Sequence, residues 1–416
     1  MKTKNFLSTI CSAYNSVSLI LRIIAGIVIG TILGLVCPSA QWISVLGALF
    51  VSSLKAVAPV LVFALIASSL SNGNAKIDRR FGTVIILYMV STLAASFIAT
   101  AASFTFPVTI TFAQQAQAAS APSGIGQVMK NLLTNAVSNP VSAIANANYI
   151  GILVWASIFG ISVKRFASEP TRTMFNEITQ AISQIVRWII NLAPFGILGL
   201  VFETVSTNGL SIFTNYGKLI AVLIGSMLIM FFIISPLIIA LMLKRNPYPL
   251  VFRCLRESGI TAFFTRSSAA NIPVNMKLCE KLGLDEDMYS VSIPLGATIN
   301  MDGAAITIAV MTLATVHTLG IVVDIPTALI LCILSTFGAC GASGVAGGSL
   351  LLIPMACSLF GISNDIAMQV VGVGFIIGVV QDSMETALNS ASDVMFTATA
   401  EYYSWKKKGK PLPEKF

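Results

Sequence analysis

Residues 297–306 read ATINMDGAAI and put polar groups in the middle of a long apolar region. Asn300 brings an amide, Asp302 a carboxylate, and Gly303 a residue that weakens a helix. A charged side chain at the centre of a bilayer costs on the order of 3 kcal/mol or more, so these groups must face protein, an ion or a substrate. The stretch predicts a helix interrupted at Asn300–Gly303, whose freed backbone carbonyls can bind a cation beside the carboxylate.

The composition of the whole chain places this stretch in a membrane. The 416 residues are 56% hydrophobic and 10% charged, with a mean hydropathy of +0.86, whereas a soluble domain carries about 25% charged residues. A spanning helix needs about 20 mostly apolar residues. Such stretches recur at about 17–36, 43–70, 82–112, 149–163, 180–206, 217–243, 288–316, 326–360 and 364–400. We therefore predict an all-α polytopic membrane protein, since barrel strands would give short alternating segments.

The basic residues indicate which helix ends share a side of the membrane. The net charge is +8, and lysines and arginines gather in alternate loops. These loops are the N-terminus, 71–81, 164–172, 244–256, 277–281 and the tail 401–416. The positive-inside rule makes them cytoplasmic, so both termini are expected there. This topology accounts for the charge, and no nucleic-acid partner is expected.

Two segments do not fit the pattern of a helix that crosses the membrane once. Segment 250–276 lies between two basic loops, 244–256 and 277–287, and 326–360 lies between two loops without basic residues, so each is expected to enter and leave on one side. The second has the glycine-rich centre FGACGASGVAGGS. Each precedes a helix with buried acids, 286–316 and 364–400. Two re-entrant hairpins that enter from opposite sides indicate an inverted repeat, which is typical of transporters.

The last helix carries a polar stripe in the stretch QDSMETALNSASD, residues 381–393. At the helical period, Asp382, Asn389 and Asp393 lie within about 40° of one another, with Thr386 beside them and Glu385 about 60° to one side. Carboxylate, amide and carbonyl oxygens suit hard cations, and Na⁺ is favoured over H⁺. No nucleophile–base pair or transition-metal set appears, so an enzyme is not expected.

These motifs together resemble a known family. PLGATINMDG at 294–303, TRSS at 265–268 and the stripe on the last helix are similar to the glutamate transporter family, the dicarboxylate/amino acid:cation symporters, over residues 15 to 400. The resemblance implies eight transmembrane helices plus two re-entrant helical hairpins, a homotrimer, and a transport domain that moves like an elevator against a scaffold.

The resemblance also implies a division of the chain. Scaffold helices 1–2 would occupy 1–81, transport-domain helix 3 would occupy 82–113, and an external loop with scaffold helices 4–5 would occupy 114–215. The rest would be helix 6 at 216–249, hairpin 1 at 250–281, broken helix 7 at 286–316, hairpin 2 at 326–361, helix 8 at 364–400 and a basic tail at 401–416.

Residue roles follow from the same resemblance. Asp382 would bind the substrate ammonium group. The full substrate set would be Arg266, Ser267, Ser268, Met301, Val345, Asp382, Glu385, Thr386 and Asn389. One Na⁺ site would use Gly296, Asn300, Asn389 and Asp393; a second would use Thr298, Met301, Ala339, Cys340 and Ala342; a third would use Tyr88, Ser91, Thr92, Asn300 and Asp302.

Two departures from the family pattern bear on the substrate. Members that carry acidic substrates place an arginine where this chain has Glu385, and a threonine where it has Ala304. Glu385 would repel a substrate carboxylate. The resemblance is therefore greatest to bacterial serine/threonine:sodium symporters, which implies a multi-pass protein of the bacterial inner membrane that imports L-serine and L-threonine.

Na⁺ is the expected coupling ion, membrane lipid is the expected surroundings, and no organic cofactor is expected. Two alternatives stay open at this point. One is a Na⁺- or H⁺-coupled symporter of acidic amino acids or C4-dicarboxylates. The other is an ion channel, since the same oxygen-rich stripe could line a pore.

Overall fold

The computed structural model describes residues 14, 16–71, 79–111, 130, 133–342 and 347–413, and every regular element in these ranges is a helix. Val345 of the predicted substrate set lies outside the described residues, as does most of 114–148. Within that loop the structure describes one short helix of more than one turn, α6 (Pro140–Ala145).

One group of helices packs around α9. Glycines make this packing close, because a Cβ at Gly26 or Gly30 would collide with the backbone carbonyl of Pro194 or Leu198. This Gly-x-x-x-Gly spacing is the usual device for bringing membrane helices into backbone contact. α2 packs along α9, and α3 packs against α7, α8 and α9. The bounds are α2 (Leu19–Val36), α3 (Ser44–Ser71), α7 (Tyr149–Phe166), α8 (Glu169–Asn191) and α9 (Ala193–Asn208), with the 3-10 turn η1 (Gln41–Ile43) before α3.

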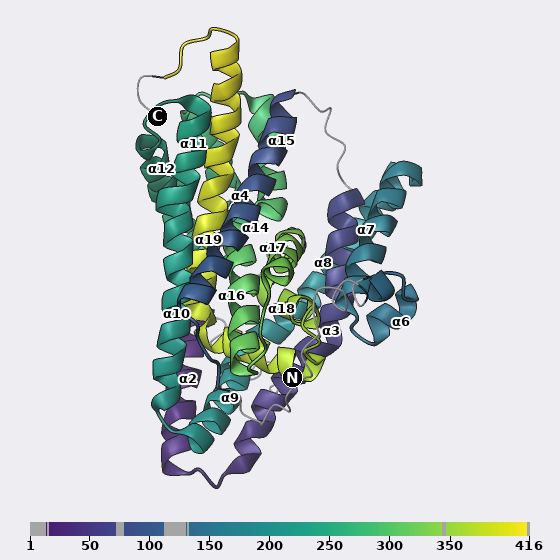
Figure 1. Ribbon diagram of the computed structural model, residues 1–416, viewed down its shortest axis with the longest axis vertical. Helices are drawn as coiled ribbons and strands as arrows, with labels where there is room; N and C mark the ends of the chain where they lie inside the picture. Colours follow the sequence, from purple (N-terminus) through teal and green to yellow (C-terminus); the bar gives the residue numbers. More distant parts are fainter. Residues whose placement is uncertain are drawn as a thin grey trace, which may run out of the picture.

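A second group surrounds α19 (Asn364–Lys407), which Figure 1 shows in yellow, with α7 standing apart at the right. α19 contacts α4, α10, α11, α13, α14, α15, α16 and α18. The bounds are α4 (Arg79–Thr105), α10 (Ser211–Ile229), α11 (Ser235–Leu243), α12 (Tyr248–Cys254), α13 (Ile260–Thr265), α14 (Ser268–Lys281), α15 (Glu286–Ile299), α16 (Asp302–Thr318), α17 (Ile325–Ala339) and α18 (Ile353–Ser358). π-helical turns join α10 to α11 (η2, Met230–Ile234) and α12 to α13 (η3, Leu255–Gly259), and a 3-10 turn (η4, Ser349–Leu352) precedes α18.

The described helices fit a protein that crosses the membrane several times. Six of them are long and apolar enough to span a bilayer, or up to seven if α8 and α9 count as one span bent by 51°. That bend falls inside the predicted span 180–206, which is therefore not one straight helix. Two predicted ends were also wrong: α4 ends at Thr105 rather than near 112, and α19 continues past 400 to Lys407.

The predicted interruption at ATINMDGAAI is confirmed. α15 ends at Ile299, α16 begins at Asp302, and Asn300 and Met301 have non-helical backbone angles. Gly303 has a different role from the one predicted, because it lies inside α16. A Cβ there would come within 2.8 Å of the Glu385 Cα, so the glycine lets α16 approach the backbone of α19.

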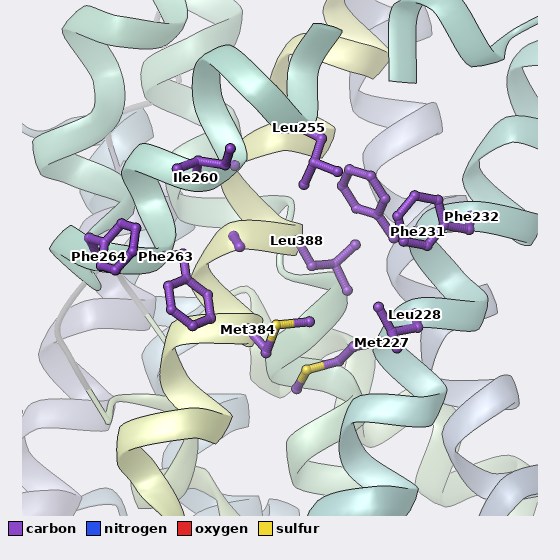
Figure 2. A pocket seen from close by; sticks show the side chains of 12 residues that line it. Met227, Leu228, Phe231, Phe232, Leu255, Ile260, Phe263, Phe264, Met384 and Leu388 are labelled. Carbon is purple, nitrogen blue, oxygen red and sulfur yellow. The ribbon is translucent and has the colours of Figure 1, made fainter. Parts of the chain in front are cut away.

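The two sides of α19 have different surroundings. One side faces the break between α15 and α16. The other side, at Met384, Ala387 and Leu388, borders an apolar pocket of about 150 Å³ (Figure 2). Helix α10, the π-helical turn η2 and the segment from η3 to α13 complete that pocket.

Candidate functional site

The site forms where α19 meets the break between α15 and α16. Asn389 connects the two: its Oδ1 accepts a hydrogen bond from the Gly303 backbone N–H at 2.7 Å, and its Nδ2 donates to the Met301 Sδ at 3.4 Å. Both Asn389 and Met301 are buried. The non-helical backbone at 300–301 is thereby held against the polar face of α19.

Asn300 and Asp393 form the most buried part of the site. Asn300 Nδ2 donates to Asp393 Oδ1 at 2.9 Å, to Ser392 Oγ at 2.7 Å and to the Asn389 carbonyl at 3.3 Å. The remaining oxygens, Asn300 Oδ1 and Asp393 Oδ2, are buried and receive no hydrogen bond from any described residue. Such groups are rare and call for an explanation, and carboxylate and amide oxygens are the kind of ligand that a hard cation takes.

Gly296 is the closest neighbour of this pair on α15. A Cβ at Gly296 would lie 2.6 Å from Asp393 Oδ1 and 2.7 Å from the Tyr88 hydroxyl. The glycine therefore leaves room for the carboxylate, which any larger residue would displace. The structure brings together Gly296, Asn300, Asn389 and Asp393, the four residues predicted for one Na⁺ site.

Asp302 contacts two of the α4 residues that were predicted, together with it, for a third Na⁺ site. Ser91 Oγ donates to Asp302 Oδ2 at 2.7 Å, and Thr92 Oγ1 donates to Asp302 Oδ1 at 3.1 Å. Tyr88 lies on the same helix but has other partners: its hydroxyl is 3.0 Å from Thr397 Oγ1 and donates to the Asp393 carbonyl at 3.2 Å. The three α4 residues thus border Asp302 and Asp393.

The residues predicted for another Na⁺ site lie where the end of α17 approaches the end of α15. The Cys340 Sγ donates to the backbone carbonyl of Ile299 at 3.5 Å. Ile299 is the last residue of α15 before the break. Ala339 and Ala342 are buried beside Cys340. Thr298 bonds within its own helix, to the Leu295 carbonyl at 2.7 Å.

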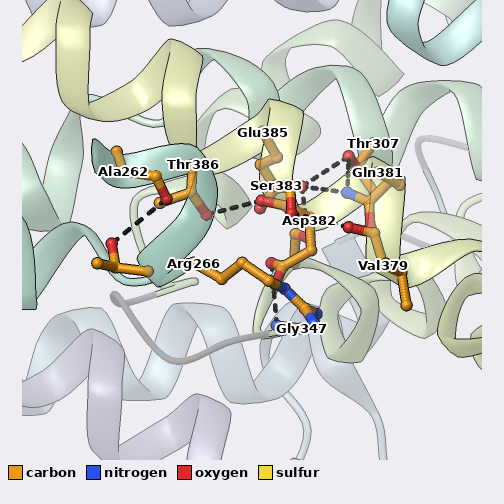
Figure 3. Close-up of polar contacts among 12 residues, drawn as sticks. Ala262, Arg266, Thr307, Gly347, Val379, Gln381, Asp382, Ser383, Glu385 and Thr386 are labelled. Atoms are coloured by element: carbon orange, nitrogen blue, oxygen red, sulfur yellow. Dashed lines mark hydrogen bonds and ion pairs between the residues drawn. The ribbon is translucent and has the colours of Figure 1, made fainter. Parts of the chain in front are cut away.

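Asp382 lies where two distant segments meet (Figure 3). Arg266 Nε donates to Asp382 Oδ2 at 2.6 Å, and the Gly347 backbone N–H donates to Asp382 Oδ1 at 3.2 Å. Arg266 follows α13 in a left-handed conformation with φ of 51°. Ser267 caps α14, Ser268 is buried, and Thr386 Oγ1 donates to the Asp382 carbonyl at 2.7 Å. The carboxylate expected to bind the substrate ammonium is thus paired with the chain's own guanidinium.

Glu385 lies next to Asp382 but turns toward α16 and η4. Its Oε2 accepts hydrogen bonds from Thr307 Oγ1 at 2.7 Å, Ser349 Oγ at 2.9 Å and Gln381 Nε2 at 2.5 Å. All three bonds converge on one oxygen. Thr307, Ser349 and Gln381 were not among the predicted residues, although the spacing of Gln381 four residues before Glu385 is a signal that helical periodicity could have used.

A second polar network was also missed. Asn271 and Asn275 of α14, Ser258 of η3 and Ser390 of α19 are buried and bonded to one another. Asn271 Nδ2 donates to Ser390 Oγ at 2.7 Å, and Asn275 Nδ2 donates to the Ser390 carbonyl at 3.0 Å. This network fastens both arms of the 250–281 segment to α19, two turns beyond Asp382.

The charges around the break do not balance. Asp302, Asp382, Glu385 and Asp393 are all buried, and Arg266 is the cation that pairs with one of them among the described residues. Uncompensated buried charge is strongly unfavourable. The arrangement is therefore suited to binding additional positive charge.

The comparisons with known proteins agree on one family. The profile of the sodium:dicarboxylate symporter family matches residues 19–402. A serine/threonine transporter SstT of Bifidobacterium adolescentis is 61% identical over 404 residues, which cover 97% of this chain and 94% of that protein. Serine/threonine transporters SstT from two Streptococcus thermophilus strains are 58% and 59% identical, each over 95% of this chain and 98% of the relative.

Proposed function

The chain belongs to the sodium:dicarboxylate symporter family, and we propose that it imports serine and threonine together with Na⁺. It is a transporter rather than an enzyme, and Na⁺ symport is the activity that the family implies. The observation that carries the proposal is the pair of buried oxygens on Asn300 and Asp393 that receive no hydrogen bond from the described residues. They lie three turns along α19 from Asp382, the acid that would bind the amino acid.

The cation part of the proposal rests on the oxygen-rich break. Asn300, Asp393 and the neighbouring carbonyls supply hard ligands for Na⁺, with Gly296 leaving space for the carboxylate. Asp302, with Ser91 and Thr92, supplies a second negative centre. The carbonyls at the end of α15 and the end of α17 supply the remaining predicted site. Na⁺ bound at these places would offset buried negative charge that the chain leaves uncompensated.

The amino acid would bind at Asp382, through its ammonium group. Arg266 holds this carboxylate in the described state, so substrate binding requires Arg266 to give up at least part of its contact. Thr386, Asn389, Ser268 and the backbone of the 265–268 turn would hold the rest of the amino acid. This exchange explains how one buried carboxylate stays compensated with and without substrate.

The neutral character of the substrate rests on Glu385. Glu385 lies three residues after Asp382 on α19, at the position where family members with acidic substrates have an arginine. A second acid there disfavours a substrate that carries its own side-chain carboxylate. The relatives that share about three-fifths of their residues with this chain are named serine/threonine transporters, which supports the same substrates.

The proposed architecture has eight transmembrane helices and two re-entrant hairpins in an inverted repeat. The two helix groups support a scaffold made of α2, α3 and α7–α9 and a transport domain around α19. The transport domain would move as an elevator within a homotrimer in the bacterial inner membrane, with both termini cytoplasmic. The Lys55–Asp365 ion pair joins the two groups and would break as they slide.

Uptake into proteoliposomes tests the proposed function. Labelled serine should accumulate above its external concentration when Na⁺ is high outside, and threonine should compete. Replacing external Na⁺ with choline should abolish accumulation. Full accumulation driven by a proton gradient without Na⁺ would contradict the coupling ion, and a serine-independent conductance without accumulation would indicate a channel.

A further inference from the structure

The apolar pocket on the other side of α19 has no role in the transport site described above. Its twelve lining residues come from α10 and η2, from η3 and α13, and from α19 (Figure 2). All of them are apolar or glycine, and the pocket measures about 150 Å³. An apolar cavity of about this size stays dry and accepts a small hydrocarbon. It is too small for a protein helix and suits part of an alkyl chain.

The position of the pocket indicates where such a chain comes from. One wall belongs to the span Phe213–Leu243, the most hydrophobic of the described spans. The side chains of Leu228, Ile260 and Phe264 line the pocket and are 40%, 48% and 71% exposed. Exposed apolar side chains therefore border the mouth of the pocket, which suits contact with the hydrocarbon of a bilayer.

A positive charge lies beside the pocket along the chain. Arg256 stands between the lining residues Leu255 and Ile260 and is exposed. No side chain in the described part of the chain forms an ion pair with it, whereas its neighbour Arg253 pairs with Glu257 at 3.3 Å. A guanidinium next to an alkyl-sized pocket matches the two ends of a phospholipid, since arginine binds phosphate through several donors.

Two of the three walls of the pocket contain a π-helical turn. η2 contributes Phe231 and Phe232, and η3 contributes Leu255 and Gly259. Such turns interrupt the regular hydrogen-bond ladder and often occur at functional sites. Here they occur on two facing elements at the same pocket, which independently supports a bound ligand.

We propose that this pocket is a binding site for a phospholipid of the surrounding bilayer. One acyl chain lies between α10, α13 and α19, and the lipid phosphate contacts Arg256. The lipid supports α13, whose end leads directly to Arg266 and so to Asp382. Filling the pocket thus stabilises the segment that carries the guanidinium of the transport site.

Photo-crosslinking tests the site on the full chain. The protein is reconstituted in nanodiscs that contain phosphatidylglycerol with a diazirine at the end of one acyl chain, irradiated, and digested for mass spectrometry. We expect cross-links in the segments 255–264 and 384–388, at higher yield than on the exposed face of α11. Equal labelling of α11 and the pocket segments would overturn the proposal. The assay needs neither serine nor a Na⁺ gradient, so its failure would leave the transport function untouched.

Two variants separate the acyl-chain contact from the phosphate contact. Ala387→Phe should lower pocket labelling by about tenfold or more, because a large side chain on the floor leaves no room for the chain. Leu228→Trp should narrow the exposed mouth of the pocket and lower labelling for the same reason. It serves as the alternative variant if the Ala387→Phe protein does not assemble. Arg256→Gln should lower labelling about fivefold, the factor expected for one basic residue near a lipid surface.

Matched controls make the result specific. Leu237→Phe enlarges an exposed side chain of α11 outside the pocket, and Arg253→Gln removes the neighbouring arginine that already has an acid partner. Neither should change pocket labelling by more than about twofold, because neither residue contacts the proposed lipid. Equal losses in Arg253→Gln and Arg256→Gln, or unchanged labelling in both pocket variants, would contradict the proposal.

Discussion

Asp382 and Asp393 lie on the same helix, three turns apart, and both are buried, yet they are stabilised in different ways. Both oxygens of Asp382 accept hydrogen bonds, one from the Arg266 guanidinium and one from the Gly347 N–H. Asp393 has an amide on Oδ1, and its Oδ2 receives nothing from the described residues. Among the described residues, the first carboxylate is paired with a cation and the second only with an amide.

This difference separates the two ligands of the proposed transport cycle. A Na⁺ ion would bind at Asp393 Oδ2, so its binding would add charge without displacing any described contact. A substrate ammonium would compete with Arg266 at Asp382, so its binding is an exchange. Variants of the two aspartates should therefore fail in different measurements.

Asp393→Asn should have the largest effect. The substitution removes the negative charge that would hold Na⁺ in a buried site, where loss of one partner costs about 3–5 kcal/mol, so Na⁺-driven serine uptake should fall by roughly 100-fold or more. The measurement is initial uptake rate in proteoliposomes at matched protein content. Asp287→Asn, which changes an exposed acid in the first turn of α15 for which no ion pair is seen among the described residues, is the control. Uptake near the parent rate in Asp393→Asn would remove this residue from the cation site.

Asp382→Asn should weaken the binding of serine and leave the binding of Na⁺ unchanged. A charge-assisted bond to an ammonium contributes roughly 1.5–3 kcal/mol, so the apparent affinity for serine should fall by about one to two decades. Binding of radioactive ²²Na⁺ to the purified, properly assembled variant should stay close to that of the parent. Unchanged serine affinity would show that the ammonium binds elsewhere, and an equal loss of Na⁺ binding would erase the distinction between the two aspartates.

Glu385→Arg should change the substrate class more than the rate. Arginine would remove a repulsive charge and offer a bidentate partner to a carboxylate, so aspartate should compete against labelled serine about tenfold better than in the parent. Glu385→Gln removes only the repulsion and should give a smaller gain. If Glu385→Arg still transports serine and aspartate competes no better, residue 385 does not face the substrate side chain.

Ser91→Ala should give the smallest effect. One neutral hydroxyl donor to Asp302 contributes about 1 kcal/mol, so the Na⁺ concentration for half-maximal uptake should rise about fivefold. Ser53→Ala on α3 is a control, since that hydroxyl bonds only to its own helix, at the Leu49 carbonyl. A Na⁺ dependence of uptake identical to that of the parent would show that Ser91 and its bond to Asp302 do not contribute to cation binding.

Much of this arrangement was predictable because it follows from local rules. The apolar spans come from composition, the break comes from Asn300–Gly303 within an apolar helix, and the polar stripe comes from helical spacing between 382 and 393. Helix ends were less accurate, since α19 continues as a helix through basic residues to Lys407. Ends depend on caps and packing rather than on hydrophobicity.

The rest depends on contacts between distant segments. The Arg266–Asp382 pair joins residues 116 positions apart, and Glu385 takes its partners from α16 and η4 as well as from its own helix. The role of Gly303 also needed the fold, because only the approach of α19 excludes a side chain there. A single sequence gives the polarity of these residues and not the direction in which their side chains turn.

We propose that Na⁺ binds beside Asp393 and that this binding prepares Asp382 for the amino acid. Equilibrium binding of labelled serine to the purified protein, measured over a range of Na⁺ concentrations at constant ionic strength with choline, tests it most directly. Coupled sites must affect one another's affinity reciprocally. The account predicts that serine affinity rises steeply with Na⁺ in the parent and becomes independent of Na⁺ in Asp393→Asn. Equal serine affinity in Na⁺ and in choline for the parent would contradict it.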